Sequence, residues 1–152
     1  MSNRAHLAWL KDDRRGAVAV EFALVAPVLI ALLLGLANTI MGFTAAIQLN
    51  NAVQAGASYC MKNGTASCTT TQIQSIVANG TALAIPSGQV TLSLTYGCAS
   101  AATVTTQAAA TPNCSNGYAP GEYAIVGATY TYVTLIGQIG IPLSATTLIR
   151  IQ

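Results

Sequence analysis

Few side chains in this 152-residue chain could do chemistry, and they are divided between its two ends. The single histidine, His6, lies in a charged N-terminal stretch, whereas all four cysteines lie far beyond it. After Glu21, the only charged residues are Lys62, Glu122 and Arg150. General acid–base catalysis needs two positioned groups with matched pKa values, and one carboxylate cannot supply both. We therefore expect no catalytic residues and no enzyme activity.

The sequence also lacks the motifs of metal, cofactor and nucleic-acid sites. Its cysteines do not have the paired CxxC spacing of a zinc site. Gly137 and Gly140 are typical of a turn and not of a glycine-rich phosphate loop. The net charge of +2 comes from residues 1–16, so the remainder offers no basic surface for phosphates. We expect no metal, no cofactor and no nucleic-acid partner.

The four cysteines, Cys60, Cys68, Cys98 and Cys114, predict two disulfides if this region faces an oxidising compartment. Three connectivities are possible, and we favour the sequential one, Cys60–Cys68 with Cys98–Cys114, because it closes two short loops. A loop as long as 98–114 gains about 3 kcal/mol of stability in the chain-entropy model. In a cytoplasmic domain the same residues would instead be reduced, buried thiols.

An apolar segment follows the charged N-terminus. Ala, Leu, Ile and Val dominate from Phe22 to Ile47, so a helix there is long enough to span a bilayer. The segment exceeds the apolar core of about 7–15 residues found in a cleaved signal peptide. Basic residues precede it and none follows until Lys62, which predicts a cytoplasmic N-terminus and an external remainder. Pro27 predicts either a kink or a tolerated membrane proline.

The helix is expected to continue beyond the membrane, to about Asn63. Small and apolar residues recur there every three to four positions, at Ala45, Leu49, Ala52, Gly56 and Tyr59. Small side chains on one side of a helix allow a neighbouring helix to approach closely. Lys62 in the last turn and Gly64 after it predict the end of the helix.

The residues that follow the long helix predict a small head domain. A second helix is expected from the cap at 68–71 to Asn79-Gly80, because apolar residues repeat at helical spacing. Alternating apolar and polar residues predict three strands. They lie at 90–96, 122–136 and 143–151, with turns at 86–88 and 137–142. Residues 99–121, rich in Ala, Thr and Ser, predict an exposed loop.

These elements predict an α+β fold. A long N-terminal transmembrane helix would extend into a small extracytoplasmic head that has a short helix and a three-stranded antiparallel sheet. The outer half of the long helix is the expected cover for the apolar face of the sheet. Tyr123, Tyr130 and Tyr132 fall on both faces of one predicted strand, so we interpret them as packing and edge groups.

Glu21 is the exception inside the apolar segment. A charged side chain costs about 2.5–3.5 kcal/mol at the centre of a membrane helix and less near the interface. Its carboxylate could simply reach the headgroups. Alternatively, a cut after Gly16 would give Ala17 a free ammonium group, and Glu21 would be the fifth residue of the new chain. Pairing of these two charges would set a register between packed helices.

The N-terminal motif resembles that of type IV prepilins. It has a basic leader, a glycine at the cut, and a glutamate followed by an aromatic residue, here Glu21 and Phe22, at mature positions five and six. The run GAVAVEFALVAPVLIALLLG is similar to the start of TadE-like proteins, pseudopilins of the tight-adherence (Tad, Flp-type) pilus system. QLNNAVQAGASYC resembles the segment that follows in that family. Gln54 and Ser58 stand where the family commonly has arginine, and Asn38 where it often has glutamate.

The resemblance implies a pilin-like fold and a minor pilin, pseudopilin or assembly factor that acts in filament assembly and surface adhesion. It implies cleavage by a prepilin peptidase between Gly16 and Ala17, with Arg14 and Arg15 holding the leader in the cytoplasm. Glu21, followed by Phe22, would serve assembly and recognition. The implied partners are the peptidase, other pilin or pseudopilin subunits, the inner-membrane assembly platform and membrane lipid.

The implied organisation is a cytoplasmic leader at 1–16, a transmembrane helix at 17–47 and a periplasmic head at 48–152. The chain would be a single-pass protein of the bacterial cytoplasmic membrane, or a subunit of the filament. The alternative hypothesis is an uncut single-pass membrane protein whose head serves as a receptor or platform subunit.

Overall fold

The computed structural model describes residues 14–100, 103–111 and 113–151. The chain divides into two compact units, Met1–Ile40 and Met41–Gln152. Positions 1–13 of the predicted leader, with His6, lie outside the described residues.

Helix α2, Arg14–Ser67, supplies all the described residues of the first unit and the first element of the second. It continues through Pro27, and its non-helical backbone angles are at Gly64 (φ 73°, ψ 176°). A positive φ strains residues that carry a side chain, so glycine suits this position. The regular helix therefore ends at Asn63, as the sequence predicted.

Helix α3, Thr70–Asn79, is the predicted second helix. The side chain of Thr69 caps its start by accepting a hydrogen bond from the backbone N–H of Gln72, at 3.4 Å. The backbone N–H of Gly80 closes its end by donating to the carbonyl of Ile76, at 2.8 Å. Ile73 and Val77, two of the residues that gave the helical spacing, are fully buried.

A four-stranded antiparallel sheet completes the head, in the order β2-β1-β3-β4. The short 3-10 helix Ser87–Gln89 leads into β1, and the strands are β1 (Val90–Ala99), β2 (Val104–Gln107), β3 (Gly121–Val133) and β4 (Gly140–Arg150). The predicted three-stranded sheet was therefore one strand short. β2 lies inside the predicted loop 99–121 because β1 extends to Ala99, where it pairs with Val104 across a turn. The backbone N–H of Ser100 closes that turn by donating to the carbonyl of Thr103.

The turn between β3 and β4 also differs from the prediction. β3 ends at Val133, so Leu135 and Ile136 belong to the connecting loop and not to the strand. The chain reverses at Gly137 and Gln138, which both have positive φ. β4 then begins at Gly140 and contains Pro142. The proline is tolerated because β4 is an edge strand, where a missing N–H need not break the ladder.

The core of the head lies between the sheet, α3 and the part of α2 that follows Ile40. Its buried residues include Leu49, Ala52, Val53, Ala57, Ile73, Val77, Val90, Ala124, Val126, Ala128 and Ala145. At Gly56 the three elements meet: a Cβ added there would lie 3.1 Å from Cγ2 of Val77 and 3.5 Å from Cγ1 of Val126. The predicted cover of the sheet by the outer half of the helix is confirmed.

Candidate functional site: the N-terminal half of helix α2

The predicted processing position lies in the first turn of α2. Since α2 begins at Arg14, the peptide bond between Gly16 and Ala17 falls within that turn. Glycine is about 1 kcal/mol less favourable inside a helix than alanine. Gly16 is exposed, and a Cβ added to it would meet nothing within 4 Å. The exposed glycine therefore makes this part of the helix less stable than an alanine would.

Glu21 and Phe22 follow in the second turn, and both are exposed. Glu21 comes four residues after Ala17, so the two positions lie one above the other on one face of the helix, about 6 Å apart along its axis. The structure thus gathers the predicted leader charges, the cleavage position and the recognition residues into residues 14–22. It keeps them in a different unit from all four cysteines.

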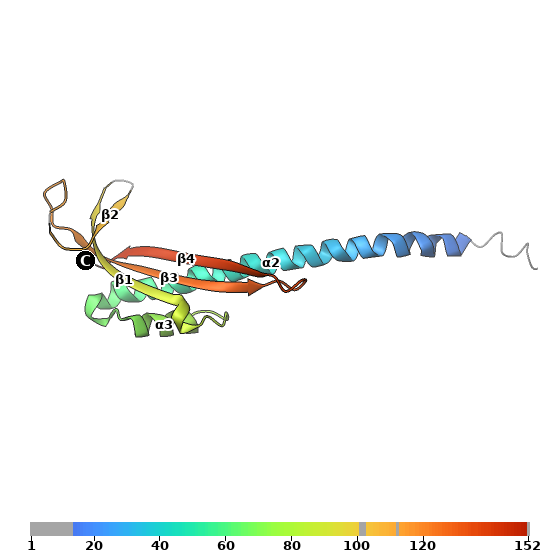
Figure 1. Cartoon of the computed structure of the whole chain (residues 1–152), viewed down its shortest axis with the longest axis horizontal. Helices are drawn as coiled ribbons and strands as arrows, with labels where there is room; N and C mark the ends of the chain where they lie inside the picture. The colour runs from blue at the N-terminus through green and yellow to red at the C-terminus, as the bar shows by residue number, and fades with distance from the viewer. Residues whose placement is uncertain (1–13, 101–102, 112, 152) are drawn as a thin grey trace, which may run out of the picture. The chain divides into compact units, whose positions relative to one another are not determined.

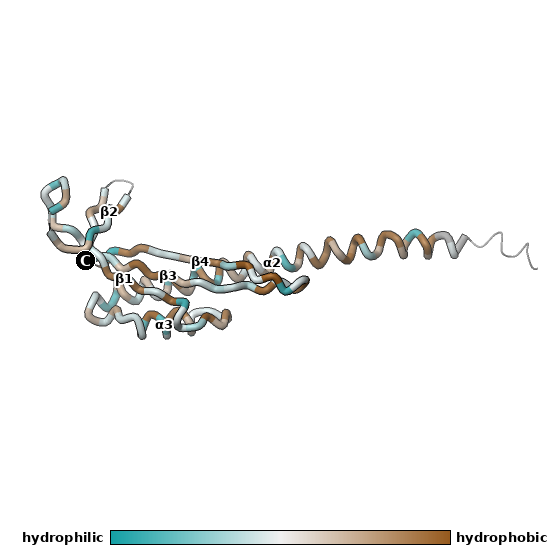
Figure 2. Tube along the Cα trace, in the orientation of Figure 1, coloured by the Kyte–Doolittle hydropathy of each residue, from teal (hydrophilic) through white to brown (hydrophobic). Residues whose placement is uncertain are grey.

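The residues that follow form an apolar stem, defined here as residues 18–36. Within the described part of the chain, one helix is long and apolar enough to cross a membrane, and its most apolar 18-residue stretch is not buried at all. Figure 2 shows hydrophobic residues along this part of α2. The large exposed side chains are Val18, Val20, Phe22, Leu24, Val25, Val28, Leu29, Ile30, Leu32, Leu33, Leu34 and Leu36. A helix that is apolar on every side is surrounded by lipid or by other helices.

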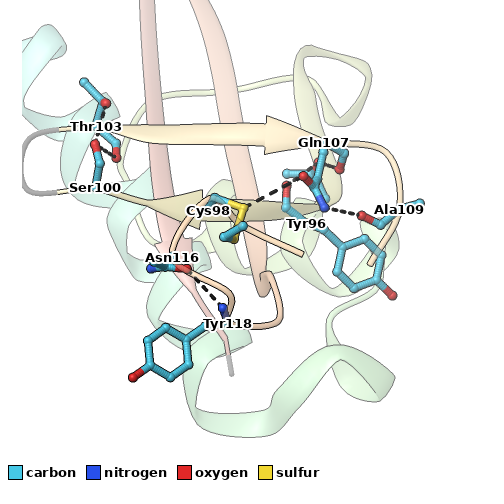
Figure 3. Close-up of a disulfide and its surroundings, with 10 residues drawn as sticks. Tyr96, Cys98, Ser100, Thr103, Gln107, Ala109, Asn116 and Tyr118 are labelled. Carbon is cyan, nitrogen blue, oxygen red and sulfur yellow. Dashed lines mark hydrogen bonds between the residues drawn. A yellow bond between two sulfur atoms is a disulfide. The ribbon is translucent and has the colours of Figure 1, made fainter. Parts of the chain in front are cut away.

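Two disulfides, Cys60–Cys68 and Cys98–Cys114, stabilise the head. They confirm the sequential pairing that the sequence favoured. The first bond joins the last turns of α2 to the start of α3, and both of its cysteines are buried. The second bond ties β1 to the loop that precedes β3 (Figure 3). In that loop the backbone N–H of Tyr118 donates to Oδ1 of Asn116, at 3.1 Å.

A cavity beside the second disulfide was missed by the sequence analysis. It has a volume of about 490 Å³, and its lining includes Cys114, Asn116, Tyr118, Tyr123 and Arg150. Tyr123 is buried, because its ring packs over the backbone of Gly97, where an added Cβ would lie 3.1 Å from it. The cavity depends on the fold of a loop closed by a disulfide. Spacing along the sequence therefore gave no signal for it.

The comparison with known families finds a match to part of the chain. The model of the TadE-like protein family matches residues 16–58, from the predicted cleavage position to the part of α2 that is buried in the head. No curated protein and no solved structure gave a significant match. Residues 16–58 are therefore similar to the TadE-like family, as the resemblance of the N-terminal motif predicted.

Proposed function

We propose that this chain is a minor pilin or pilus-assembly factor of a Tad-type (type IV) pilus, acting in filament assembly and surface adhesion. A TadE-like segment indicates a protein associated with the Tad pilus. The observation that carries the finer proposal is helix α2. Its first part is apolar and exposed on every side, and its second part is built into the core of the head. Such a helix suits a subunit that leaves the membrane by packing against other helices.

In this proposal a prepilin peptidase cuts between Gly16 and Ala17, and residues 1–16 stay in the cytoplasm. The mature chain has a transmembrane helix at 17–47 and a periplasmic head at 48–152. The basic leader supports a cytoplasmic N-terminus. The two disulfides support an oxidising compartment for the head.

Cleavage changes the electrostatics of the helix start. It places an ammonium group on Ala17, at the positive end of the helix dipole, where a cation is unfavourable. The carboxylate of Glu21 lies one turn further on, and a pair at this spacing contributes about 0.2–0.5 kcal/mol in an exposed helix. In lipid both charges are costly unless paired. Pairing between neighbouring subunits would therefore favour one axial register of the packed helices.

The first experiment measures the mass of the chain extracted from membranes of cells that have an active prepilin peptidase. The expected mass is that of Ala17–Gln152, and cells without the peptidase should give the mass that includes residue 1. Substituting Gly16→Leu should block cleavage without affecting insertion. If wild-type cells with active peptidase contain only the uncut chain, the processed pseudopilin is ruled out and the receptor or platform alternative is favoured.

The second experiment compares Glu21→Gln with Glu21→Asp. The glutamine variant loses the charge at nearly constant size, so we expect normal insertion and cleavage but loss of filament assembly or of partner co-purification. The aspartate variant keeps the charge on a shorter side chain and should retain part of that function. Normal piliation by Glu21→Gln would show that the carboxylate only reaches the headgroups and has no role in assembly.

A further inference from the structure

The β3–β4 hairpin ends in an exposed apolar surface, which we name the hairpin tip and define as residues 133–141. Five of its large apolar side chains are between 43% and 64% exposed: Val133, Leu135, Ile136, Ile139 and Ile141. Exposed apolar side chains gathered at one end of a small domain mark a site of contact with another apolar body. The processing and assembly proposal does not account for this surface.

The hairpin tip protrudes from the sheet. β1 starts at Val90, which pairs with Ala128, so β3 runs five residues further with only β4 paired to it in the sheet. At about 3.3 Å per residue, this two-stranded extension is roughly 17 Å long. Figure 1 shows the β3–β4 hairpin reaching beyond the start of β1. The apolar side chains are therefore presented at the end of an arm.

The arm is also free of charge. The sequence has no charged residue between Glu122 and Arg150. Both of these residues lie at the opposite end of the hairpin, where Arg150 pairs with Tyr123 in the register of β3 and β4. Nothing charged on the hairpin itself would have to be desolvated if its tip entered an apolar medium.

The loop at the tip satisfies its own backbone groups through Thr134, which is only 7% exposed. The hydroxyl of Thr134 donates to the carbonyl of Ile136 at 2.8 Å and accepts from the N–H of Ile139 at 2.9 Å. The backbone N–H of Thr134 also donates to the carbonyl of Ile139, at 3.0 Å. An unsatisfied backbone group costs several kcal/mol in lipid. By bonding to these backbone groups, Thr134 lowers the free-energy cost of moving the loop from water into lipid.

The part of α2 that lies beside the hairpin also exposes apolar side chains. The ring of Tyr132 lies against Gly42, where an added Cβ would be 3.6 Å from Cε1 of the tyrosine. On either side of Gly42, α2 exposes Met41 (48%) and Phe43 (68%), which continue the apolar segment into the second unit. Tyrosine is enriched at the boundary between membrane and water. Within the second unit, the arm therefore lies against a part of α2 that exposes apolar side chains.

We propose that the hairpin tip inserts into the headgroup and upper acyl region of the bilayer that holds helix α2. Leu135, Ile136 and Ile139 enter the lipid, and Tyr132 lies at its surface. The head then contacts the membrane at two places, its helix and its hairpin. This inference rests on the membrane span alone and is independent of processing and of pilus assembly.

The test uses tryptophan fluorescence of the full chain in vesicles of phosphatidylcholine and phosphatidylglycerol. Trp9, the only tryptophan of the sequence, is first replaced by phenylalanine. Single tryptophans are then introduced by Ile136→Trp at the tip, Thr105→Trp in β2 at the other end of β1, and Leu29→Trp in the apolar stem. Lipids brominated near the headgroup end of their acyl chains are used for the tip and for β2, and lipids brominated near the middle of the chains for the stem, because each quenches a tryptophan only at its own depth.

We expect Ile136→Trp to show blue-shifted emission and to lose most of it to the brominated lipids, while Thr105→Trp emits as in water and is not quenched. Quenching of Leu29→Trp with an unquenched Ile136→Trp would overturn the hairpin proposal and leave the membrane span intact. If Leu29→Trp is not quenched either, the proposal that helix α2 spans the membrane is ruled out as well. Blue-shifted but unquenched emission from Ile136→Trp, lost on diluting the protein in lipid, would assign the tip to a second copy of the chain and overturn the proposal.

Discussion

The two parts of helix α2 are built from similar residues but have opposite surroundings. In the stem, Leu33 is 57% exposed, and no residue of the most apolar stretch is buried. In the head, Leu49 is 1% exposed and Ala52 is fully buried, while Asn50 and Asn51 on the other side of the helix are exposed. The comparison shows that apolar content alone does not say where a helix lies. A stripe of apolar residues indicates a protein core, and an apolar surface on every side indicates lipid or a bundle of helices.

The largest expected effect comes from shortening one leucine in each part. Leu49→Ala should lower the free energy of unfolding of the head by about 4 kcal/mol, because a fully buried leucine leaves a cavity. Leu33→Ala should change it by less than about 0.5 kcal/mol, because the head does not use that side chain. Urea unfolding of the detergent-solubilised protein, followed by near-ultraviolet circular dichroism, measures both. Equal destabilisation by the two variants would contradict the division of α2 into a stem and a core helix.

The second prediction concerns the covalent bond at the end of the buried part. Replacing both Cys60 and Cys68 with alanine should lower the stability of the head by about 2.5 kcal/mol, the chain-entropy value for so short a loop. The helix content of the stem should not change, because neither cysteine lies in that unit. Unfolding curves of the double variant and of the oxidised wild-type chain give the measurement. A double variant as stable as the wild type would show that packing alone holds α3 against α2.

The smallest of the three expected effects on stability is that of enlarging a glycine, and it is tested at one glycine in each part of α2. Gly56→Leu should destabilise the head by about 2 kcal/mol, because even a Cβ at this position would press on Val77 and Ile73 at 3.1 and 3.4 Å. Gly35→Leu should be neutral for the head, since an added Cβ meets nothing within 4 Å. The same unfolding assay measures both variants. Tolerance of leucine at Gly56 would mean that α3 and the sheet can move away from α2.

Most elements of the fold could be predicted from local signals. The cap at Thr69 and the apolar spacing of Ile73 and Val77 identified α3, and a single glycine identified the end of the regular helix. The pairing of the cysteines followed from loop length. Each of these signals lies within a few residues of the structure that it determines.

The other parts of the fold were not predicted, because they depend on contacts between residues that are distant in the sequence. β2 is a four-residue strand, Val104–Gln107, in a stretch of Ala and Thr without clear alternation. It forms because β1 offers a free edge, where the hydroxyl of Thr95 donates to the carbonyl of Gln107 at 3.0 Å. Leu135 and Ile136 have the composition of a strand but form a loop, because Thr134 closes the hairpin before them. The predicted cleavage position and the role proposed for Glu21 rest on motif and charge alone, since both lie on an exposed helix with no fold around them.

Gly64 interrupts the helical conformation of α2 inside the loop that Cys60 and Cys68 close, and this affects how the chain transmits a pulling force. A pulling force applied between α2 and β4 passes through the bond between the two sulfurs, so residues 61–67 carry no load. The weakest part of the helix is thereby shielded from tension. Reducing the bond would release a hidden length of roughly 25 Å, at about 3.5 Å for each extended residue. A single-molecule pulling experiment on the wild-type chain and on a variant with both Cys60 and Cys68 replaced by alanine would record that step directly.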